Sequence, residues 1–218
     1  MKDMSLKMPR ERLSFHHSII CWMNNKDVKK RNMERQIDNK LNYLEIHVEI
    51  NASSLWFVGL KERMKQLNVG CKKGFHITAA FLKDDKLKDE LCEVFDRTLS
   101  HRKAPRLTFN RLEAFTSMSG KEHIVCLTSS QPEVEYLALV EDLRNEALKI
   151  GADLEPYRLH VTLARVPVKI ISLENLQELV AEIKLREFKL ALTTIEYRYR
   201  NPDLKKGLIM SWKLKEAK

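Results

Sequence analysis

Phe75-His76-Ile77-Thr78-Ala79 and Leu159-His160-Val161-Thr162-Leu163 repeat one pattern, apolar-His-apolar-Thr-apolar, at positions 84 residues apart. In a β-strand successive side chains point to opposite faces, so the His and Thr of each stretch share one face. The apolar residues share the other face, which needs a layer of helices to cover it. The two stretches therefore predict two strands with unlike faces, and the rest of the chain is interpreted around them.

Segments around these strands alternate between strand and helix periodicity. Tyr43–Ile50 alternates aliphatic with polar or aromatic residues, which predicts a strand, and a helix is predicted at about 54–67. Ser130-Gln-Pro-Glu133 has the form of a capping box and predicts the start of another helix. The other predicted elements are strands at 74–82, 106–116, 122–128, 157–166, 190–200 and 207–215, a helix from Asp84 or Asp85, and a helix at about 173–185 capped by Ser172.

The order of these elements, β-α-β-α-β-β-α-β-α-β-β, indicates an α+β protein. An antiparallel or mixed sheet can leave one face uncovered. We expect two pseudo-symmetric β-α lobes, each a ferredoxin-like unit, forming an open concave antiparallel or mixed sheet with helices on the outer faces. A ligand site is then expected between the lobes, on the uncovered face.

Composition limits the kinds of protein that this chain can be. Of its 218 residues 44% are hydrophobic and 32% charged, which allows a core and excludes wholesale disorder. No run approaches the ~18–20 apolar residues of a membrane span, and the N-terminus lacks the apolar segment of a signal peptide. We therefore expect a cytoplasmic protein with no membrane association. The four cysteines are spaced too widely for a paired zinc motif and are expected to be reduced thiols.

The net charge of +9 favours an anionic partner and is concentrated near the N-terminus. Residues 1–40 hold ten Lys or Arg against five Asp or Glu and show no sustained periodicity. We expect them to be a basic, poorly ordered N-terminal extension, and residues 41–218 to form the two-lobed domain.

Duplication of the His/Thr pair is the feature that points to chemistry. One such pair occurs in many half-buried strands and has no functional meaning by itself. Two copies on corresponding strands would place both pairs in one groove. Histidine, with an unperturbed pKa of about 6.5, can take or give a proton at neutral pH, so His76 and His160 can serve together as acid and base. The hydroxyls of Thr78 and Thr162 can donate hydrogen bonds to phosphate oxygens.

These motifs resemble the signature of the two-histidine phosphoesterase superfamily, which includes bacterial 2′-5′ RNA ligase-like proteins and cyclic nucleotide phosphodiesterases. The resemblance spans about 43–215. The run Tyr157-Arg-Leu-His-Val-Thr-Leu-Ala-Arg-Val166 is similar to the family's second motif, and Ile195-Glu-Tyr-Arg-Tyr199 is similar to its closing hairpin. The chain departs from the family pattern at Leu159, where the family commonly has proline, and in its 1–40 extension.

The resemblance implies a phosphoesterase that acts on 2′,3′-cyclic phosphate or 2′-5′ phosphodiester linkages of RNA or oligonucleotides. His76 and His160 would be the general acid and base, in an order that the sequence leaves open, and Thr78 and Thr162 would bind phosphate. Neither a metal nor a cofactor is required. Ligation, the reverse reaction, is open to the same site, with hydrolysis favoured in water. The implied partner is RNA, an oligonucleotide or a cyclic nucleotide, and no obligate protein partner is inferred.

Five further side chains are candidates for substrate contacts, namely Arg158, His47, Tyr43, Tyr197 and Tyr199. Arg158 shares the parity of His160 and is either a phosphate ligand or a surface charge. The two residues of the first strand lie on its polar face, which is alternatively a solvated face. The tyrosines near the C-terminus could stack on a base or pack in the core. Arg165 has the opposite parity from His160 and is expected to form a structural ion pair.

Two other classes of function stay open from the sequence alone. The same open sheet could bind a nucleotide or RNA without turnover, as ferredoxin-like RNA-binding proteins do, although such proteins need no duplicated His/Thr pair. A structural or adaptor protein could use residues 1–40 to dock elsewhere. Deletion of that segment without loss of activity or partners would argue against the adaptor.

Overall fold

The computed structural model describes residues 41–83, 86–200 and 206–216, so the predicted extension 1–40 lies outside the described residues. The helices in these ranges are α2 (Leu55–Gln66), α3 (Lys88–Leu99), α4 (Val134–Lys149) and α5 (Leu173–Ala181). The strands of the main sheet are β1 (Leu41–His47), β2 (His76–Leu82), β5 (Arg111–Thr116), β6 (Glu122–Thr128), β7 (Val161–Pro167), β9 (Thr194–Arg200) and β10 (Lys206–Lys213). The short strands are β3 (Lys103–Ala104), β4 (Arg106–Phe109), β8 (Phe188–Ala191) and β11 (Lys215–Glu216).

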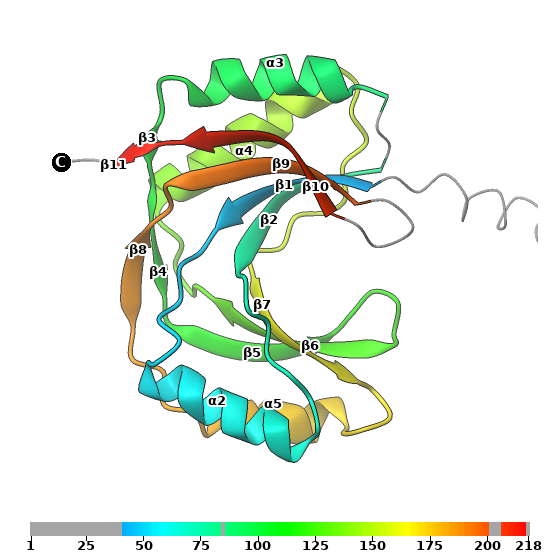
Figure 1. The fold of residues 1–218 in the computed structure, drawn as a ribbon, viewed down its shortest axis with the longest axis vertical. Helices are drawn as coiled ribbons and strands as arrows, with labels where there is room; N and C mark the ends of the chain where they lie inside the picture. Colours follow the sequence, from blue (N-terminus) through cyan, green and yellow to red (C-terminus); the bar gives the residue numbers. More distant parts are fainter. Residues whose placement is uncertain (1–40, 84–85, 201–205, 217–218) are drawn as a thin grey trace, which may run out of the picture. The chain divides into compact units, whose positions relative to one another are not determined.

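One antiparallel sheet of seven strands, in the order β10-β9-β1-β2-β7-β6-β5, organises these elements. Helices α3 and α4 pack on the half that contains β1, β2, β9 and β10, and α2 and α5 lie along the half that contains β5, β6 and β7 (Figure 1). Helix α2 follows β1 in sequence yet lies beside α5, where Arg63 and Glu182 form an ion pair of 2.7 Å. The predicted α+β class and the large antiparallel sheet are confirmed.

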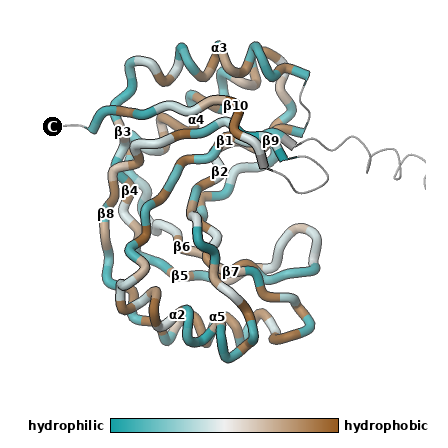
Figure 2. The backbone as a smooth tube through the Cα atoms, in the orientation of Figure 1, coloured by the Kyte–Doolittle hydropathy of each residue, from teal (hydrophilic) through white to brown (hydrophobic). Residues whose placement is uncertain are grey.

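The core lies between the sheet and the helices. Leu60 and Met64, four residues apart on α2, are fully buried, as are Ile77 and Val161 at the centres of the two motifs. Hydrophilic and hydrophobic residues alternate along the helices, so none of them is apolar all round (Figure 2). Within the described ranges, no helix combines the length and the hydropathy needed to span a membrane.

Both motif strands carry a β-bulge directly after their threonine. In β2 the extra residue is Ala79, because consecutive residues of β1 pair with its two neighbours. In β7 the extra residue is Leu163, because consecutive residues of β6 pair with Thr162 and Ala164. A bulge shifts the alternation of all later side chains on its strand by one residue. The two bulges therefore decide which residues beyond each motif share a face with the His/Thr pair.

Each bulge leaves a carbonyl group that a long-range partner satisfies. The carbonyl oxygen of Leu163 accepts a hydrogen bond of 2.7 Å from the backbone N–H of Lys72. The carbonyl oxygen of Ala79 accepts from Nη1 of Arg144, at 3.3 Å, and Nη2 of the same side chain donates to the carbonyl of Glu155 at 2.9 Å. Arg144 thus ties the first motif strand to the segment that leads into the second.

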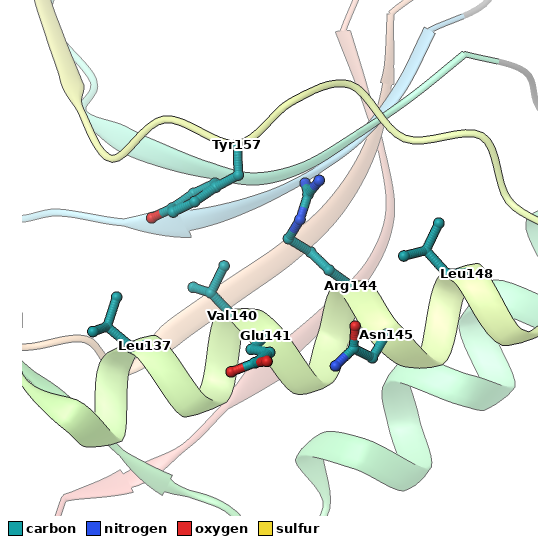
Figure 3. Close-up of a pocket in the computed structure, with 7 residues that line it drawn as sticks. All are labelled: Leu137, Val140, Glu141, Arg144, Asn145, Leu148 and Tyr157. Carbon is teal, nitrogen blue, oxygen red and sulfur yellow. The ribbon is translucent and has the colours of Figure 1, made fainter.

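Arg144 is also one wall of a cavity of about 370 Å³ on α4, and Figure 3 shows its guanidinium pointing away from the helix toward the strand behind. The other lining residues are Leu137, Val140, Glu141, Asn145, Leu148 and Tyr157. None of the four His and Thr side chains of the motifs belongs to this lining. The cavity lies on the helical side of the sheet and is not the predicted ligand site.

The predicted capping box at the start of α4 is wrong. The helix begins at Val134 with Glu133 as its N-cap, and no side chain makes a capping hydrogen bond there. The carboxylate of Glu133 instead accepts from the N–H and hydroxyl of Thr108, at 2.9 and 2.5 Å, and pairs with Lys189 at 2.7 Å. Burial opposes ionisation of Glu133, but the hydrogen bonds from Lys189 and Thr108 outweigh it and lower its pKa to about 2. A long-range acceptor role has replaced the local cap.

Other predicted bounds differ because strand pairing is not local. The strand predicted at 106–116 is broken at Asn110, since β4 pairs with β8 in a separate two-stranded sheet. The strand predicted from 157 begins only at Val161. The last predicted helix ends at Ala181, although Ser172 caps it as predicted by accepting from the N–H of Asn175. Asp84, Asp85 and the turn predicted around 201–203 lie outside the described residues.

Candidate active site

The two motifs meet where the halves of the sheet join. The one register pair between β2 and β7 joins Ile77 and Val161, the residues between the His and the Thr of each motif. Both residues are fully buried against the helices, so the four His and Thr side chains lie on the opposite face, on either side of this pair. All four are half-buried. We call this side of the sheet, which carries His76, Thr78, His160 and Thr162, the motif face.

The bulge in β7 turns Arg165 onto the motif face, so the parity predicted for Arg165 is wrong. Thr162 is opposite Cys126, and Arg165 is opposite Ile124, two residues along β6, so Thr162 and Arg165 share a face. The guanidinium of Arg165 donates from Nη1 to Glu122 at 3.0 Å. The structural ion pair that was predicted is present, but it holds a cation on the same side as the motifs.

His76 lies against a buried carboxylate. Its Nδ1 is 3.4 Å from Oε2 of Glu45, whose side chain is only 6% exposed. The pairing of β1 with β2 creates this contact, because Glu45 is opposite Thr78 and His47 is opposite His76. Within the described part of the chain, Oε2 of Glu45 accepts no hydrogen bond. One oxygen of a buried carboxylate is therefore directed at the first motif histidine.

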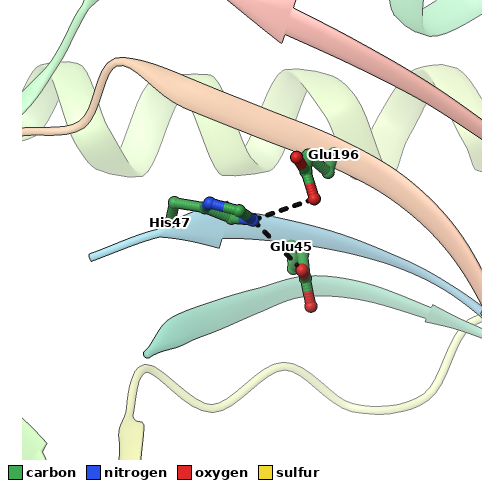
Figure 4. A group of neighbouring side chains, drawn as sticks. All are labelled: Glu45, His47 and Glu196. Carbon is green, nitrogen blue, oxygen red and sulfur yellow. Dashed lines mark hydrogen bonds and ion pairs between the residues drawn. The ribbon is translucent and has the colours of Figure 1, made fainter. Parts of the chain in front are cut away.

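Glu45 belongs to a charged network with His47, Glu196 and Arg198. Nε of Arg198 lies 2.7 Å from Oε1 of Glu45 and 2.6 Å from Oε2 of Glu196. Nε2 of His47 lies 3.1 and 2.9 Å from the same two oxygens (Figure 4). Ligand atoms of Glu45, His47 and Glu196 fall within 4.8 Å of one another, a spacing that a metal ion can use. Arg198 already places one cation against both carboxylates, which offsets part of their negative charge from within the protein.

His160 has a different environment, made of cations and an aromatic ring. Its Nδ1 donates a hydrogen bond of 3.0 Å to the carbonyl oxygen of Arg158, which leaves Nε2 for a substrate. Phe115 meets the imidazole edge to face, with ring centroids 5.4 Å apart, and the Arg158 guanidinium lies 3.5 Å above the same phenyl ring. Burial lowers the pKa of His160; the hydrogen bond to Arg158 opposes this, and the charges of Arg158 and Arg165 lower it further. His160 is therefore neutral at neutral pH.

Tyr197 and Tyr199 do not face the motifs, so both predicted substrate contacts are wrong. Tyr197 is fully buried, packs against Phe95 of α3 with ring centroids 5.6 Å apart, and its hydroxyl accepts a hydrogen bond from Asn42. Tyr199 has the same parity on β9, and its ring covers Gly207, where a Cβ would come within 1.9 Å of it. Tyr197 therefore belongs to the core on the helical side, whereas Tyr199 is 40% exposed and lies against β10.

Tyr43 lies on the motif face but is not a surface residue. It is 4% exposed, stacks on Phe81 at a centroid distance of 6.1 Å, and lies 6.4 Å from the ring of His76. Burial and the charge of Glu45 raise the pKa of Tyr43 to about 12, so its hydroxyl is uncharged. We interpret Tyr43 as a support beneath His76.

Among the other predicted contacts, Arg158 is exposed and His47 is partly exposed.

Glu196 and Arg198 are the residues that the sequence reasoning missed. They alternate on β9, and their register partners on β1 are Glu45 and Tyr43, which places them on the motif face. The signal was available, because a strand with a charged residue at every second position has a polar face. The tyrosines of that strand, which were the predicted substrate contacts, occupy the intervening positions.

Comparison with known proteins identifies similar sequences and folds. The sequence model of the 2′-5′ RNA ligase superfamily matches residues 72–201. No curated protein matches the chain. Escherichia coli LigT in complex with 3′-AMP has a similar fold, with a TM-score of 0.52 and 15% identity over 82% of this chain and 100% of that chain.

Two further solved structures share the fold. Kluyveromyces marxianus Usb1 with uridine monophosphate has a TM-score of 0.56 and 10% identity, and covers 80% of this chain and 98% of that chain. A protein described as a phosphoesterase has a TM-score of 0.54 and 16% identity, over 81% of this chain and 99% of that chain. At these identities the similarity establishes the fold alone.

Proposed function

Because this chain belongs to the 2′-5′ RNA ligase superfamily, as its motifs predicted, we propose that it is a phosphoesterase of the two-histidine type. Its substrates would be 2′,3′-cyclic phosphate or 2′-5′ phosphodiester linkages of RNA, oligonucleotides or cyclic nucleotides. His76 and His160 would act as general acid and base without a metal, and Thr78 and Thr162 would bind phosphate. The activity would reside in residues 41–218.

The observation that carries this proposal is the register pair between Ile77 and Val161. It brings the two motif strands together at the residue between each His and Thr, with both apolar side chains turned inward. Two imidazoles and two hydroxyls are then presented on one face, at the seam between the halves of the sheet. That is the minimum set for transferring two protons around a bound phosphate.

The reaction balances with two histidines alone. For a 2′,3′-cyclic phosphate, one neutral imidazole takes a proton from water as the water oxygen attacks phosphorus. The bond from phosphorus to one ribose oxygen breaks, and the second, protonated imidazole gives its proton to that oxygen. For a 2′-5′ linkage the attacking group is the neighbouring 3′-hydroxyl, the leaving group is the 5′-oxygen, and the cyclic phosphate is the product. Ligation is the reverse of this step.

The threonine hydroxyls and a nearby arginine suit the charge of the phosphate. Thr78 and Thr162 are half-buried beside their histidines and can donate to non-bridging oxygens. Arg165, on the same face as Thr162, adds a planar cation of the kind that binds phosphate. Arg158, exposed and stacked on Phe115, can contact the nucleotide beyond the reacting bond.

A second candidate function is nucleotide or RNA binding without turnover on the same face. The solved complexes of LigT with 3′-AMP and of Usb1 with uridine monophosphate show that proteins of this fold hold nucleotides. Binding alone does not require two imidazoles. The asymmetric environments of His76 and His160 favour catalysis, because an acid and a base must differ in protonation.

Turnover of a small panel with EDTA present tests the proposal. The panel contains 2′,3′-cyclic nucleotides and 2′-5′ and 3′-5′ dinucleotides, assayed with wild type, His76→Ala, His160→Ala and the control His101→Ala. His101 is exposed and outside the motifs, so its replacement should leave turnover unchanged. We expect wild type to cleave a cyclic or 2′-5′ member, and each motif variant to lose about 10²–10⁴-fold in rate. Binding without turnover by wild type would instead support the binding module.

A deletion of residues 1–40 tests where the activity resides. We expect the shortened protein to turn over the same panel member as wild type. Loss of turnover in a folded deletion variant would place part of the active site in the extension.

A further inference from the structure

We propose that Glu45 is a positioning residue that keeps His76 protonated, so that His76 is the general acid and His160 the general base for cleavage. This inference rests on the function proposed above and assigns the two roles that the motifs leave equivalent. It arises from the charges on either side of the seam between β2 and β7. The four motif residues themselves are chemically the same on both sides.

The contact between Glu45 and His76 places a carboxylate oxygen beside one nitrogen of the imidazole. Nδ1 of His76 lies 3.4 Å from Oε2 of Glu45, at ion-pair distance, so a proton on Nδ1 would carry its positive charge beside the carboxylate. A protonated Nε2 can then reach a leaving oxygen. His160 has no equivalent arrangement, because its Nδ1 is bonded to a neutral carbonyl group. In the described part of the chain, no carboxylate lies within ion-pair distance of His160.

Glu45 divides its two oxygens between different partners. Oε1 receives Arg198 and His47, whereas Oε2 is left for His76. Arg198 places a cation against this buried carboxylate, since an unpaired buried charge would be costly. Glu196, held by the same arginine and histidine, fixes the guanidinium from the other side. The network therefore delivers a fixed negative charge to one histidine only.

The charged groups that act directly on the two histidines have opposite signs. Toward His76 lie Glu45, His47 and the uncharged Tyr43 from β1, with Glu196 and Arg198 from β9 behind them. Toward His160 lie Arg158 and Arg165, whose charges act on it directly, and Cys126 of β6, whose thiol burial keeps neutral. Two carboxylates share this face, Glu122, which pairs with Arg165 at 3.0 Å, and Glu113, which is opposite Cys126.

A nearby carboxylate favours the protonated form of an imidazole, and nearby cations favour the neutral form. The lowered pKa of His160 agrees with this direction. At neutral pH the pair therefore starts with the acid on β2 and the base before β7. The base takes the proton of the attacking hydroxyl or water, the acid gives its proton to the leaving oxygen, and exchange with solvent restores both.

Leaving-group dependence tests the assignment. The substrates are a 2′-5′ uridine dinucleotide and uridine 2′-(4-nitrophenyl phosphate). In both of them the 3′-hydroxyl attacks phosphorus. The dinucleotide expels an alkoxide that needs a proton, whereas 4-nitrophenolate leaves without one. The enzymes are wild type, His76→Ala, His160→Ala, Glu45→Gln and the control Glu49→Gln, which replaces an exposed carboxylate just beyond β1.

We expect Glu45→Gln to lose about 10–100-fold, and His76→Ala about 10²–10⁴-fold, in kcat/KM on the dinucleotide. Both losses should fall below tenfold on the nitrophenyl ester. His160→Ala should stay impaired on both substrates, and Glu49→Gln on neither. The assignment would be overturned if the nitrophenyl ester restored the kcat/KM of His160→Ala and not that of His76→Ala.

A second readout separates positioning from a general effect on folding. The pKa of His76, followed by NMR of its ring nitrogens, should fall in Glu45→Gln and stay unchanged in Glu49→Gln. An unchanged pKa in a folded Glu45→Gln protein would refute the role of Glu45. Should that variant not fold, the comparison of the two histidine variants still decides which one is the acid. Cleavage of neither substrate by wild type would overturn the proposed function, and this inference with it.

Discussion

Arg144 should be the most important single side chain outside the core for joining the two motif strands. It extends from α4 and donates one hydrogen bond to the bulged residue Ala79 of β2 and another to Glu155, in the segment before β7. Its guanidinium also lies 5.7 Å from the centroid of the Tyr157 ring. Burial lowers the pKa of Arg144, which shows that the charged group has given up part of its hydration for these contacts.

The expected cost of Arg144→Ala follows from these contacts. A hydrogen bond to a charged group contributes about 1.5–3 kcal/mol, and the bond of 3.3 Å to Ala79 belongs below that range. Loss of both bonds and of the contact with Tyr157 should lower the free energy of unfolding by about 2–4 kcal/mol. For a domain of this size that corresponds to a fall in Tm of about 5–15 °C.

Urea unfolding followed by tryptophan fluorescence measures this difference, since Trp56 and Trp212 are buried. Arg144→Met keeps the aliphatic part of the side chain and should show most of the loss, which assigns it to the hydrogen bonds. Arg97→Ala is the matched control, because Arg97 forms only an exposed ion pair of 3.5 Å and should change stability by less than about 0.5 kcal/mol. Equal stability of Arg144→Ala and Arg97→Ala would refute the reasoning.

Three further outcomes are expected. Glu133→Gln should destabilise the fold by about 1–3 kcal/mol, because it weakens the hydrogen bonds from Thr108. The pKa of Glu133 is about 2 in the folded protein and near 4.5 in the unfolded chain, so this contribution is present above pH ~4.5 and is lost as the pH falls toward 2. Acid unfolding of wild type and variant measures the difference in stability, and a constant difference between pH 5 and pH 2 would contradict the prediction. Ile77→Ala should cost about 2–5 kcal/mol in urea unfolding because Ile77 is fully buried at the strand junction, so a loss below about 1 kcal/mol would contradict that placement. Arg165→Ala removes a cation that lowers the pKa of His160, so the acid limb of the pH–rate profile should move to higher pH, and movement to lower pH would argue against His160 as the base.

Much of the fold was predictable from local patterns. The helical spacing of Trp56, Phe57, Leu60 and Met64 predicted α2 closely, and Ser172 was correctly identified as a cap. Such features depend on residues within a few positions of one another. The break at Asn110 was not predictable in this way, because β4 leaves the main sheet to pair with β8, some 80 residues away.

The candidate site shows the same difference between local and long-range features. The four motif residues were predicted from their spacing, the structure pairs their two strands, and their roles stay predictions. Tyr197 was misplaced because the aromatic side chain was considered without the parity of its strand, which turns it toward α3. Glu45 was given no role from the sequence, since its contact with His76 exists only through the pairing of β1 with β2.

The sequence by itself determined the two His/Thr pairs, the succession of helices and strands, and the family, because each is written in the order and spacing of neighbouring residues. Only the tertiary structure decided that Arg165 shares a face with the motifs, that Arg144 joins their strands, and that a carboxylate lies beside His76 and not beside His160. The physical reason is that bulges, register and ion pairs depend on partners distant in sequence. A one-residue bulge then reverses every side chain that follows it.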